Sequence, residues 1–146
     1  MRSIRYFRVL EAWQVAMELA VRAHNFAATL PAAQRFELGS QIRRSASSVP
    51  SNIAEGHAHR ADRVFLRHVN IALGSLAELD TDIELAGRLN LVDQNSVERL
   101  RLDLDRVGQL LHGLRRTLRH ATIRKTANVL LLLAGLTGVL SMLVWA

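Results

Sequence analysis

Three side chains that can bind a metal ion, Glu55, His57 and His59, lie close together in the sequence. A turn that gathered them would form a site of one carboxylate and two imidazoles, and an enzyme built on it would contain a stoichiometric metal ion. Histidines two residues apart, however, point to different sides of a helix, whereas helical zinc sites favour a spacing of four. We therefore expect an exposed turn here, with neither a metal ion nor a cofactor.

Other residues with catalytic chemistry form no recognisable motif. The sequence has no serine nucleophile motif, no glycine-rich phosphate loop and no His-Glu-x-x-His zinc motif. No glutamate precedes a histidine by three positions, as in di-iron bundles, and the absence of cysteine excludes disulfides and thiolate metal sites. His24 falls in a helical apolar pattern and is expected to be a structural histidine with a polar partner. We expect no enzyme activity and no small-molecule substrate.

Arg43 and Arg44 open a stretch of small residues that also contains Pro50. The apolar pattern of the surrounding helix continues through this stretch, so we interpret it as helix with a kink at the proline. Both arginines lie off the apolar stripe, which predicts either subunit contacts or an anion-binding site. Asn52 and Glu55 are expected to satisfy backbone groups freed by the proline or to pair with an arginine.

Small residues around this stretch predict close packing between helices. The serines and alanine at 45–48 would let the second helix approach the third at Gly74 and Ser75. Gly56 is expected to end the second helix as a C-cap.

Four segments repeat apolar residues at spacings of three and four, the pattern of amphipathic helices. Short turns separate them, residues 93–96 offer N-cap side chains for the last helix, and no segment alternates like a strand. The sequence therefore predicts an all-α fold, an antiparallel up-down-up-down four-helix bundle over residues 1–120. The predicted buried stripes are Leu10, Trp13, Met17, Ala20, His24 and Ala27; Leu38, Ile42, Ser45 or Ala46, Val49 and Ile53; Phe65, Val69, Ala72, Leu76, Leu79, Ile83 and Ala86; and Val97, Leu100, Leu104, Val107, Leu111, Leu114 and Leu118.

Arginine dominates the positive charge, since the chain has 19 basic and 13 acidic residues and only Lys125 among the basic ones is lysine. Guanidinium groups suit phosphate as well as carboxylate, so nucleic acid is a candidate partner. Basic residues concentrate in an N-terminal lead-in and near the end of the fourth helix, where they suit anionic lipid head groups. These are Arg2, Arg5 and Arg8 as candidate nucleic-acid contacts, and Arg115, Arg116, Arg119, Arg124 and Lys125 as a juxtamembrane collar.

Residues 127–146 carry no charge over 20 positions, a length that as a helix matches the roughly 30 Å hydrocarbon core of a bilayer. We interpret them as an added C-terminal transmembrane helix, with residues 121–126 as a basic juxtamembrane linker. The positive residues before the helix predict a cytoplasmic bundle, and residues 1–8 lack the apolar core of a signal peptide. The expected location is the bacterial inner membrane, with the bundle facing the cytoplasm.

Three motifs occur in order along the chain: LEAWQ at 10–14, QIRR and VPSNIAEG within 41–56, and ALGSLAEL at 72–79. Together they resemble a bacterial four-helix bundle family, the 23S rRNA intervening-sequence proteins, over about residues 5–119. The resemblance implies a ring-shaped homo-oligomer, a homopentamer, and carries no catalytic residues. A protein of similar fold, the accessory variability determinant of diversity-generating retroelements, binds nucleic acid. The chain departs from the family in the tail beyond His120.

These observations predict a non-enzymatic, oligomeric four-helix-bundle scaffold or interaction protein tethered to the cytoplasmic face of a membrane. The arginine excess and the resemblance support one alternative. It is an RNA- or DNA-binding accessory module like the retroelement protein.

Overall fold

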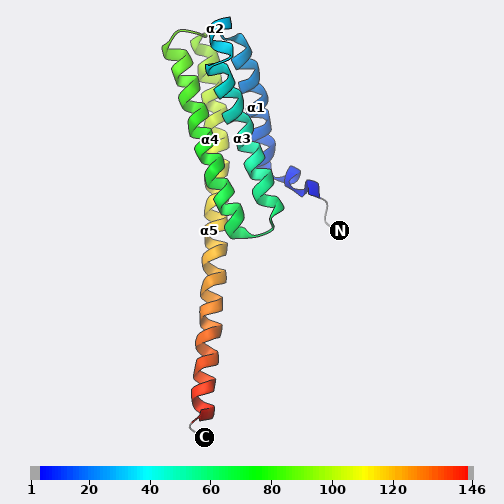
Figure 1. The fold of residues 1–146 in the computed structure, drawn as a ribbon, viewed down its shortest axis with the longest axis vertical. Helices are drawn as coiled ribbons and strands as arrows, with labels where there is room; N and C mark the ends of the chain where they lie inside the picture. The colour runs from blue at the N-terminus through cyan, green and yellow to red at the C-terminus, as the bar shows by residue number, and fades with distance from the viewer. Residues whose placement is uncertain (1–3, 145–146) are drawn as a thin grey trace.

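The chain forms helices joined by short connections, as a computed structural model shows (Figure 1). The structure describes the backbone of residues 4–144 and the side chains of residues 6–128. Within that range the predicted all-α fold is confirmed. The elements are the 3-10 helix η1 (Ile4–Val9) and the α-helices α1 (Glu11–Thr29), α2 (Ala32–Arg35), α3 (Leu38–Ala58), α4 (Asp62–Arg88) and α5 (Gln94–Val144).

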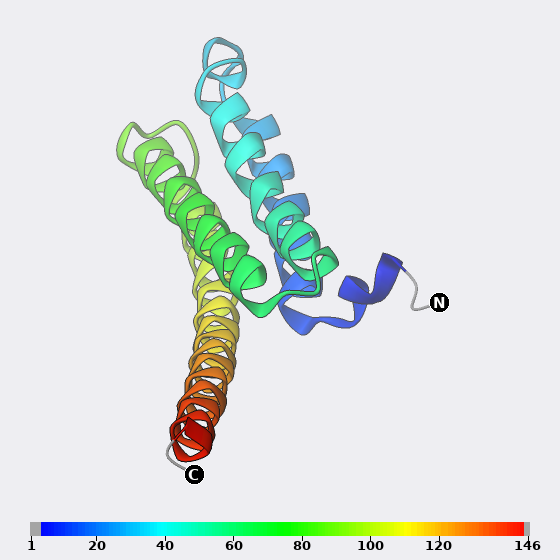
Figure 2. The ribbon, with the colours of Figure 1, turned by 60° about the horizontal axis from the view of Figure 1, so that its bottom comes forward.

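Four long helices, α1, α3, α4 and α5, run alternately up and down (Figure 1). Two hairpins build this arrangement, α1 with α3 through the short α2, and α4 with α5 (Figure 2). α3 also packs along α4, and α5 packs along α1, so each long helix has two neighbours around the bundle. The antiparallel four-helix bundle is therefore confirmed.

The core lies where the buried faces of α1, α3, α4 and α5 meet. Every predicted stripe residue of α3 and α4 is buried, including both Ser45 and Ala46, and in α5 only Leu114 is half-buried. A stripe that recurs at three and four positions keeps one side of each helix facing the others. Leucine, isoleucine and valine supply most of the volume, and Ile42, Ile53, Leu79, Ile83 and Leu111 are among the most deeply buried side chains.

The face that α1 turns to the core matches the predicted stripe only in part. Ala20 and Ala27 of the predicted stripe are buried, and Leu10 and Trp13 pack against the core, but Met17 and His24 are exposed, and the buried residues also include Ala16, Leu19 and Ala23. Both faces of α1 carry apolar residues at helical spacing, so periodicity alone does not select between them. The inward face carries alanines together with Leu19 and Phe26, and Met17 and Val21 lie on the outside of the bundle.

A side chain caps the start of α5, and a residue with left-handed backbone conformation follows the end of both α3 and α4. The Ser96 backbone N–H donates to Asp93 Oδ1 at 2.9 Å, and the hydrogen bonds from Ser96 lower the pKa of the Asp93 carboxyl. Arg60 and Asn90 have φ of 54°, just after α3 and α4. Gly56, the expected C-cap, instead lies within α3.

Gly56 matters for packing, because α4 lies directly against it. A Cβ atom at Gly56 would lie 2.6 Å from Cβ of His68 and 2.8 Å from Cδ2 of Phe65, closer than carbon atoms approach. The predicted approach at Ser75 is present, since its Oγ lies 2.8 Å from Ser48 Oγ. Gly74 faces open space instead, because a Cβ atom there would have no heavy atom of another element within 4 Å.

The structure does not support the membrane anchor that the sequence predicts. α5 runs without a break through residues 121–126, and none of the helices in the described part of the chain is long and apolar enough to cross a membrane. The expectation rested on the uncharged residues 127–146, whose side chains from 129 onward lie outside the described residues. Before them, exposed arginines lie along α5 as far as Arg124. The C-terminal transmembrane helix and the inner-membrane location are therefore not supported.

The contact at Gly56 makes a prediction about stability. Gly56→Ala should lower the free energy of unfolding by about 1–3 kcal/mol, because the added methyl group must displace atoms of α4 that lie close to its backbone. Gly74→Ala, the matched control on an exposed helical position, should raise it by up to about 1 kcal/mol, because alanine loses less backbone entropy. Urea unfolding followed by circular dichroism measures both. Equal effects of the two substitutions would contradict the close approach.

Candidate functional site

A line of polar side chains follows the surface where α3 meets α4. The Asn52 amide donates to the Ser48 carbonyl at 2.9 Å, and its Oδ1 lies 3.2 Å from Nδ1 of His68. Glu55 Oε2 lies 3.9 Å from the same nitrogen. Asn52 and Glu55 thus contact a histidine of α4, and the expected arginine pairing does not occur between the described side chains.

Arg43 fixes the connection between α1 and α3. Its Nη2 donates to the Arg35 carbonyl at 2.8 Å, at the end of α2. A guanidinium that donates to the backbone of its own chain has fewer N–H groups left for an anion. The structure therefore favours a role for Arg43 in holding α2 against α3.

Arg44 lines a polar cleft of about 420 Å³ between α3 and α4, which also contains Glu78 and Asp82. Burial raises the pKa of the Asp82 carboxyl, the Glu78 charge raises it further, and Arg44 opposes both. Glu78 and Asp82, one turn apart on α4, therefore have their counter-charge within the same chain. An anion at Arg44 would meet two carboxylates, so this cleft suits a cationic or polar group better.

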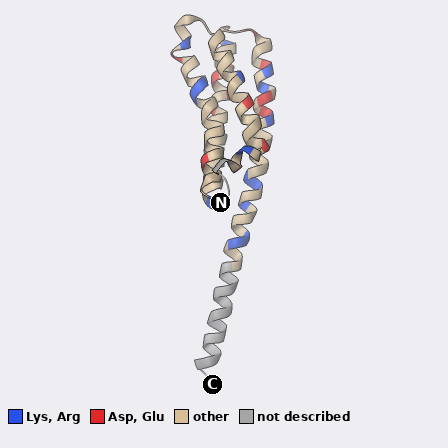
Figure 3. Ribbon diagram, turned by 90° about the vertical axis from the view of Figure 1, so that its right-hand side faces the viewer, with Lys and Arg blue, Asp and Glu red and all other residues tan. Residues whose placement is uncertain are grey.

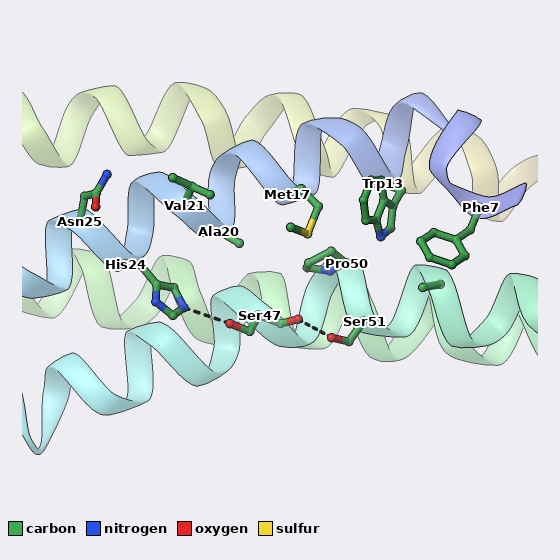
Figure 4. A pocket seen from close by; sticks show the side chains of 11 residues that line it. Phe7, Trp13, Met17, Ala20, Val21, His24, Asn25, Ser47, Pro50 and Ser51 are labelled. Atoms are coloured by element: carbon green, nitrogen blue, oxygen red, sulfur yellow. Dashed lines mark hydrogen bonds between the residues drawn. The ribbon is translucent and has the colours of Figure 1, made fainter. Parts of the chain in front are cut away.

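An apolar groove of about 520 Å³ runs between α1 and α3 on the outside of the bundle (Figure 4). α1 contributes the outer face described above, and α3 contributes the side that carries Pro50. At one end His24 Nε2 lies 3.0 Å from Ser47 Oγ, the polar partner expected for this histidine, although its ring is exposed. The lining residues are Phe7, Trp13, Met17, Ala20, Val21, His24, Asn25, Ser47, Pro50, Ser51 and Ala54.

Arg8, one of the three N-terminal arginines, lies at the other end of this groove. The Arg8 guanidinium stands 5.7 Å from the ring centre of Trp13 and 6.0 Å from that of Phe7, within the range of cation–π attraction. Arg2 and the side chain of Arg5 lie outside the described residues. Arg8 therefore extends the aromatic end of the groove and gives it positive charge.

Comparison with known proteins places this bundle in a family. A family model described as 23S rRNA-intervening sequence protein matches residues 8–113. The chain belongs to this family. A crystal structure of a protein with unknown function from the S23 ribosomal protein family of Bacteroides thetaiotaomicron is 28% identical, with a TM-score of 0.67, over 71% of this chain and 97% of that chain. No curated protein matches, and the comparisons do not extend to the retroelement accessory protein.

The family match ends at residue 113, just before the basic collar of α5. Beyond Asp105 α5 carries no acidic residue, and its ribbon shows blue but no red segments where it leaves the bundle (Figure 3). Arg115, Arg116, Arg119 and Arg124 are exposed. Lys125 differs, since its Nζ lies 2.5 Å from Asp62 Oδ2 at the start of α4. The juxtamembrane role of the collar loses its basis with the membrane helix, and four exposed guanidinium groups remain.

The cleft at Arg44 makes a prediction about pH. Because the pKa of Asp82 is raised in the folded protein, folding favours its protonated form, and the stability it contributes falls as pH rises above about 3.8. Asp82→Asn should therefore stabilise the protein at pH 7, by less than about 1 kcal/mol because solvent screens a partly exposed carboxylate. The gain should disappear below pH about 3.8.

Arg44→Gln is the control of opposite sign. It removes the cation that opposes the raised pKa of Asp82, so it should lower the melting temperature at pH 7. Thermal unfolding across this pH range measures both variants. A neutral or destabilising Asp82→Asn at pH 7 would contradict the assignment.

Proposed function

We propose that the protein is a non-enzymatic scaffold or interaction protein that assembles with further copies of itself through the groove between α1 and α3. The observation that carries this proposal is the second apolar face of α1. One face packs into the core, and the other lies exposed beside Pro50 on α3. The bundle is complete without this second face, so its apolar residues need a different partner.

The groove offers enough apolar surface to drive association. Met17 is 38% exposed and Val21 is 55% exposed. Full burial of one Met or Val side chain stabilises a contact by about 1.5–3 kcal/mol, so covering these residues would favour association. Trp13 and Phe7 lie at one end, and tryptophan and arginine are among the residues that most often dominate binding energy at protein interfaces. Arg8, which lies beside Trp13, adds an arginine to the same end of the groove.

We infer that exposed apolar side chains of α4 and α5 in the next copy fill the groove. α4 and α5 lie across the core from α1 and α3, and each exposes a large apolar side chain, Ile71 of α4 at 42% and Leu102 of α5 at 63%. When two different surfaces of one chain bind each other, the assembly grows head to tail and closes as a ring if the rotation allows it. Such a head-to-tail contact is the kind that a ring requires, and the number of five subunits comes from the family resemblance alone.

Acidic substitutions in the groove should dissociate the assembly. Met17→Asp with Val21→Asp should reduce the mass in light-scattering chromatography to that of one chain, because burial would desolvate two carboxylates without partners. Phe36→Asp, at an 89% exposed site in the connection between α2 and α3, is the matched control and should leave the mass unchanged. A wild-type protein of single-chain mass would overturn the proposal.

A mixing experiment tests the head-to-tail arrangement. Ile71→Asp with Leu102→Asp should also yield single chains, because this variant lacks the other half of the contact. Mixed with the groove variant it should form a dimer, since one intact groove and one intact α4–α5 face remain in the pair. A symmetric groove-to-groove contact would instead leave the Ile71 and Leu102 variant fully assembled, which would contradict the ring.

One observation favours nucleic-acid binding as a second candidate function. The four exposed arginines of the α5 collar lie on a helical segment without acidic residues, and planar guanidinium groups suit phosphate. Bound phosphates would release counterions, so affinity would fall steeply with salt. The collar follows the bundle, which leaves the groove free for assembly.

A salt titration of single-stranded RNA binding tests this function. Replacing Arg115, Arg116 and Arg119 by serine should reduce the slope of log affinity against log salt by about 2, at roughly 0.7 per phosphate contact. Replacing Arg88, Arg99 and Arg101 by serine removes the same charge near the turn between α4 and α5, at the other end of the bundle, and should change the slope less. No binding by the wild type, or equal slopes for both variants, would exclude the collar as a nucleic-acid site.

A further inference from the structure

We propose that Glu55, His59 and His68 bind a divalent transition-metal ion, with zinc as the best match. One ligand atom from each residue, a carboxylate oxygen and two imidazole nitrogens, lies within 4.8 Å of the other two. A site of two histidines and one carboxylate is a common zinc set that leaves one coordination position open. The site is separate from the groove between α1 and α3, so metal binding and assembly are independent.

The fold brings these three residues together through two adjacent helices. Glu55 and His59 are four positions apart at the end of α3, a spacing that places them on one side of a helix. His68 comes from α4, where the missing side chain of Gly56 permits the close approach of the two helices. The imidazole rings of His59 and His68 lie nearly parallel, with centres 5.8 Å apart and an angle of 17° between their planes.

Asn52 sets the tautomer of His68. Its amide nitrogen donates to the Ser48 carbonyl, so the amide oxygen is the atom that faces His68 Nδ1 at 3.2 Å. An amide oxygen only accepts hydrogen bonds, so a hydrogen bond at this contact requires the proton on Nδ1 and leaves the lone pair on Nε2 of the neutral ring. Nε2 is then the metal-binding atom of His68, and the Glu55 carboxylate, which lies 3.9 Å from Nδ1, must rotate to share the ion with it. Metal-binding histidines characteristically donate their second nitrogen to an oxygen in this way.

One ligand of the proposed site, His68, is held in place by its surroundings, whereas Glu55 and His59 are free to rotate. The His68 side chain is only 13% exposed and is held by Asn52, whereas Glu55 and His59 are exposed. Donor atoms in a tetrahedral zinc site stand roughly 3.4 Å apart, given bonds of about 2.0–2.2 Å. Rotation of the two exposed side chains toward His68 can close the remaining distance without moving a helix.

His57 is outside this cluster although it lies between two of the proposed ligands in sequence. Its ring lies 5.6 Å from that of Phe65 in an edge-on contact and 5.6 Å from that of Tyr6. This aromatic packing gives His57 a structural role without a metal ion. His57 is therefore not part of the metal site, although the sequence places it between Glu55 and His59. The choice between His57 and His68 as ligand is therefore testable.

Calorimetric titration of the full chain with Zn²⁺ tests the site, and the visible absorption of bound Co²⁺ reports its coordination. The wild type should bind one ion per chain, with a Co²⁺ band typical of nitrogen and oxygen ligands. His59→Ala and Glu55→Gln, both at exposed positions, should each weaken Zn²⁺ binding by at least about tenfold. His112→Ala, an exposed histidine on α5, and His57→Ala should leave the affinity unchanged.

Asn52 provides a test of positioning. Asn52→Leu should weaken Zn²⁺ binding by about 10–100-fold and alter the Co²⁺ spectrum, whereas Asn52→Asp, which keeps an oxygen acceptor, should retain both. Circular dichroism identifies any variant that fails to fold, and the wild-type titration decides independently of the variants. Absence of one-to-one binding by the wild type, or a loss in His57→Ala that equals the loss in His59→Ala, would overturn the proposal.

Discussion

The close contact between α3 and α4 at Gly56 is the constraint on which the polar seam between these two helices depends. Gly56 leaves no room for a side chain against His68 and Phe65, and Ser48 bonds directly to Ser75 on the facing helix. Helices approach this closely only where small residues line the seam. Because α3 is held against α4 on one side, its other side remains available to α1, and the outer groove forms along that second seam.

The sequence was sufficient for the bundle because three of its four long helices have one apolar face each. An apolar stripe at spacings of three and four identifies one buried face of a helix when most other positions are polar, as in α4 and the first part of α5. α1 lacked that property, so periodicity selected the face with Trp13 and Met17 while packing selected the face with Ala16 and Ala23. The error is informative, because an apolar face that the core does not use is the feature of an interface.

The candidate site could be predicted only where its residues are neighbours in the sequence. The spacing of four between Glu55 and His59 was visible, but His68 joins them through the turn after α3 and through the space at Gly56. Likewise the counter-charge of Asp82 is Arg44, on the preceding helix. The membrane anchor is wrong for a different reason. It was inferred from the composition of one segment, whereas in the described part of the chain the helix that leads into that segment has no stretch apolar enough to span a bilayer.

α3 explains why a stretch of small residues with a proline belongs in a helix. Its inner face carries Ile42, Val49 and Ile53 into the core, a second face carries Ser47 and Pro50 toward α1, and a third carries polar groups toward α4. A helix in contact on three faces cannot use large side chains on all of them, because neighbouring backbones would be forced apart. Serine meets the space limit and still satisfies its hydroxyl, since Ser45 and Ser51 bond to carbonyls of the preceding turn. The small residues of α3, which are unusual for a helix, therefore follow from its contacts with the core, with α1 and with α4.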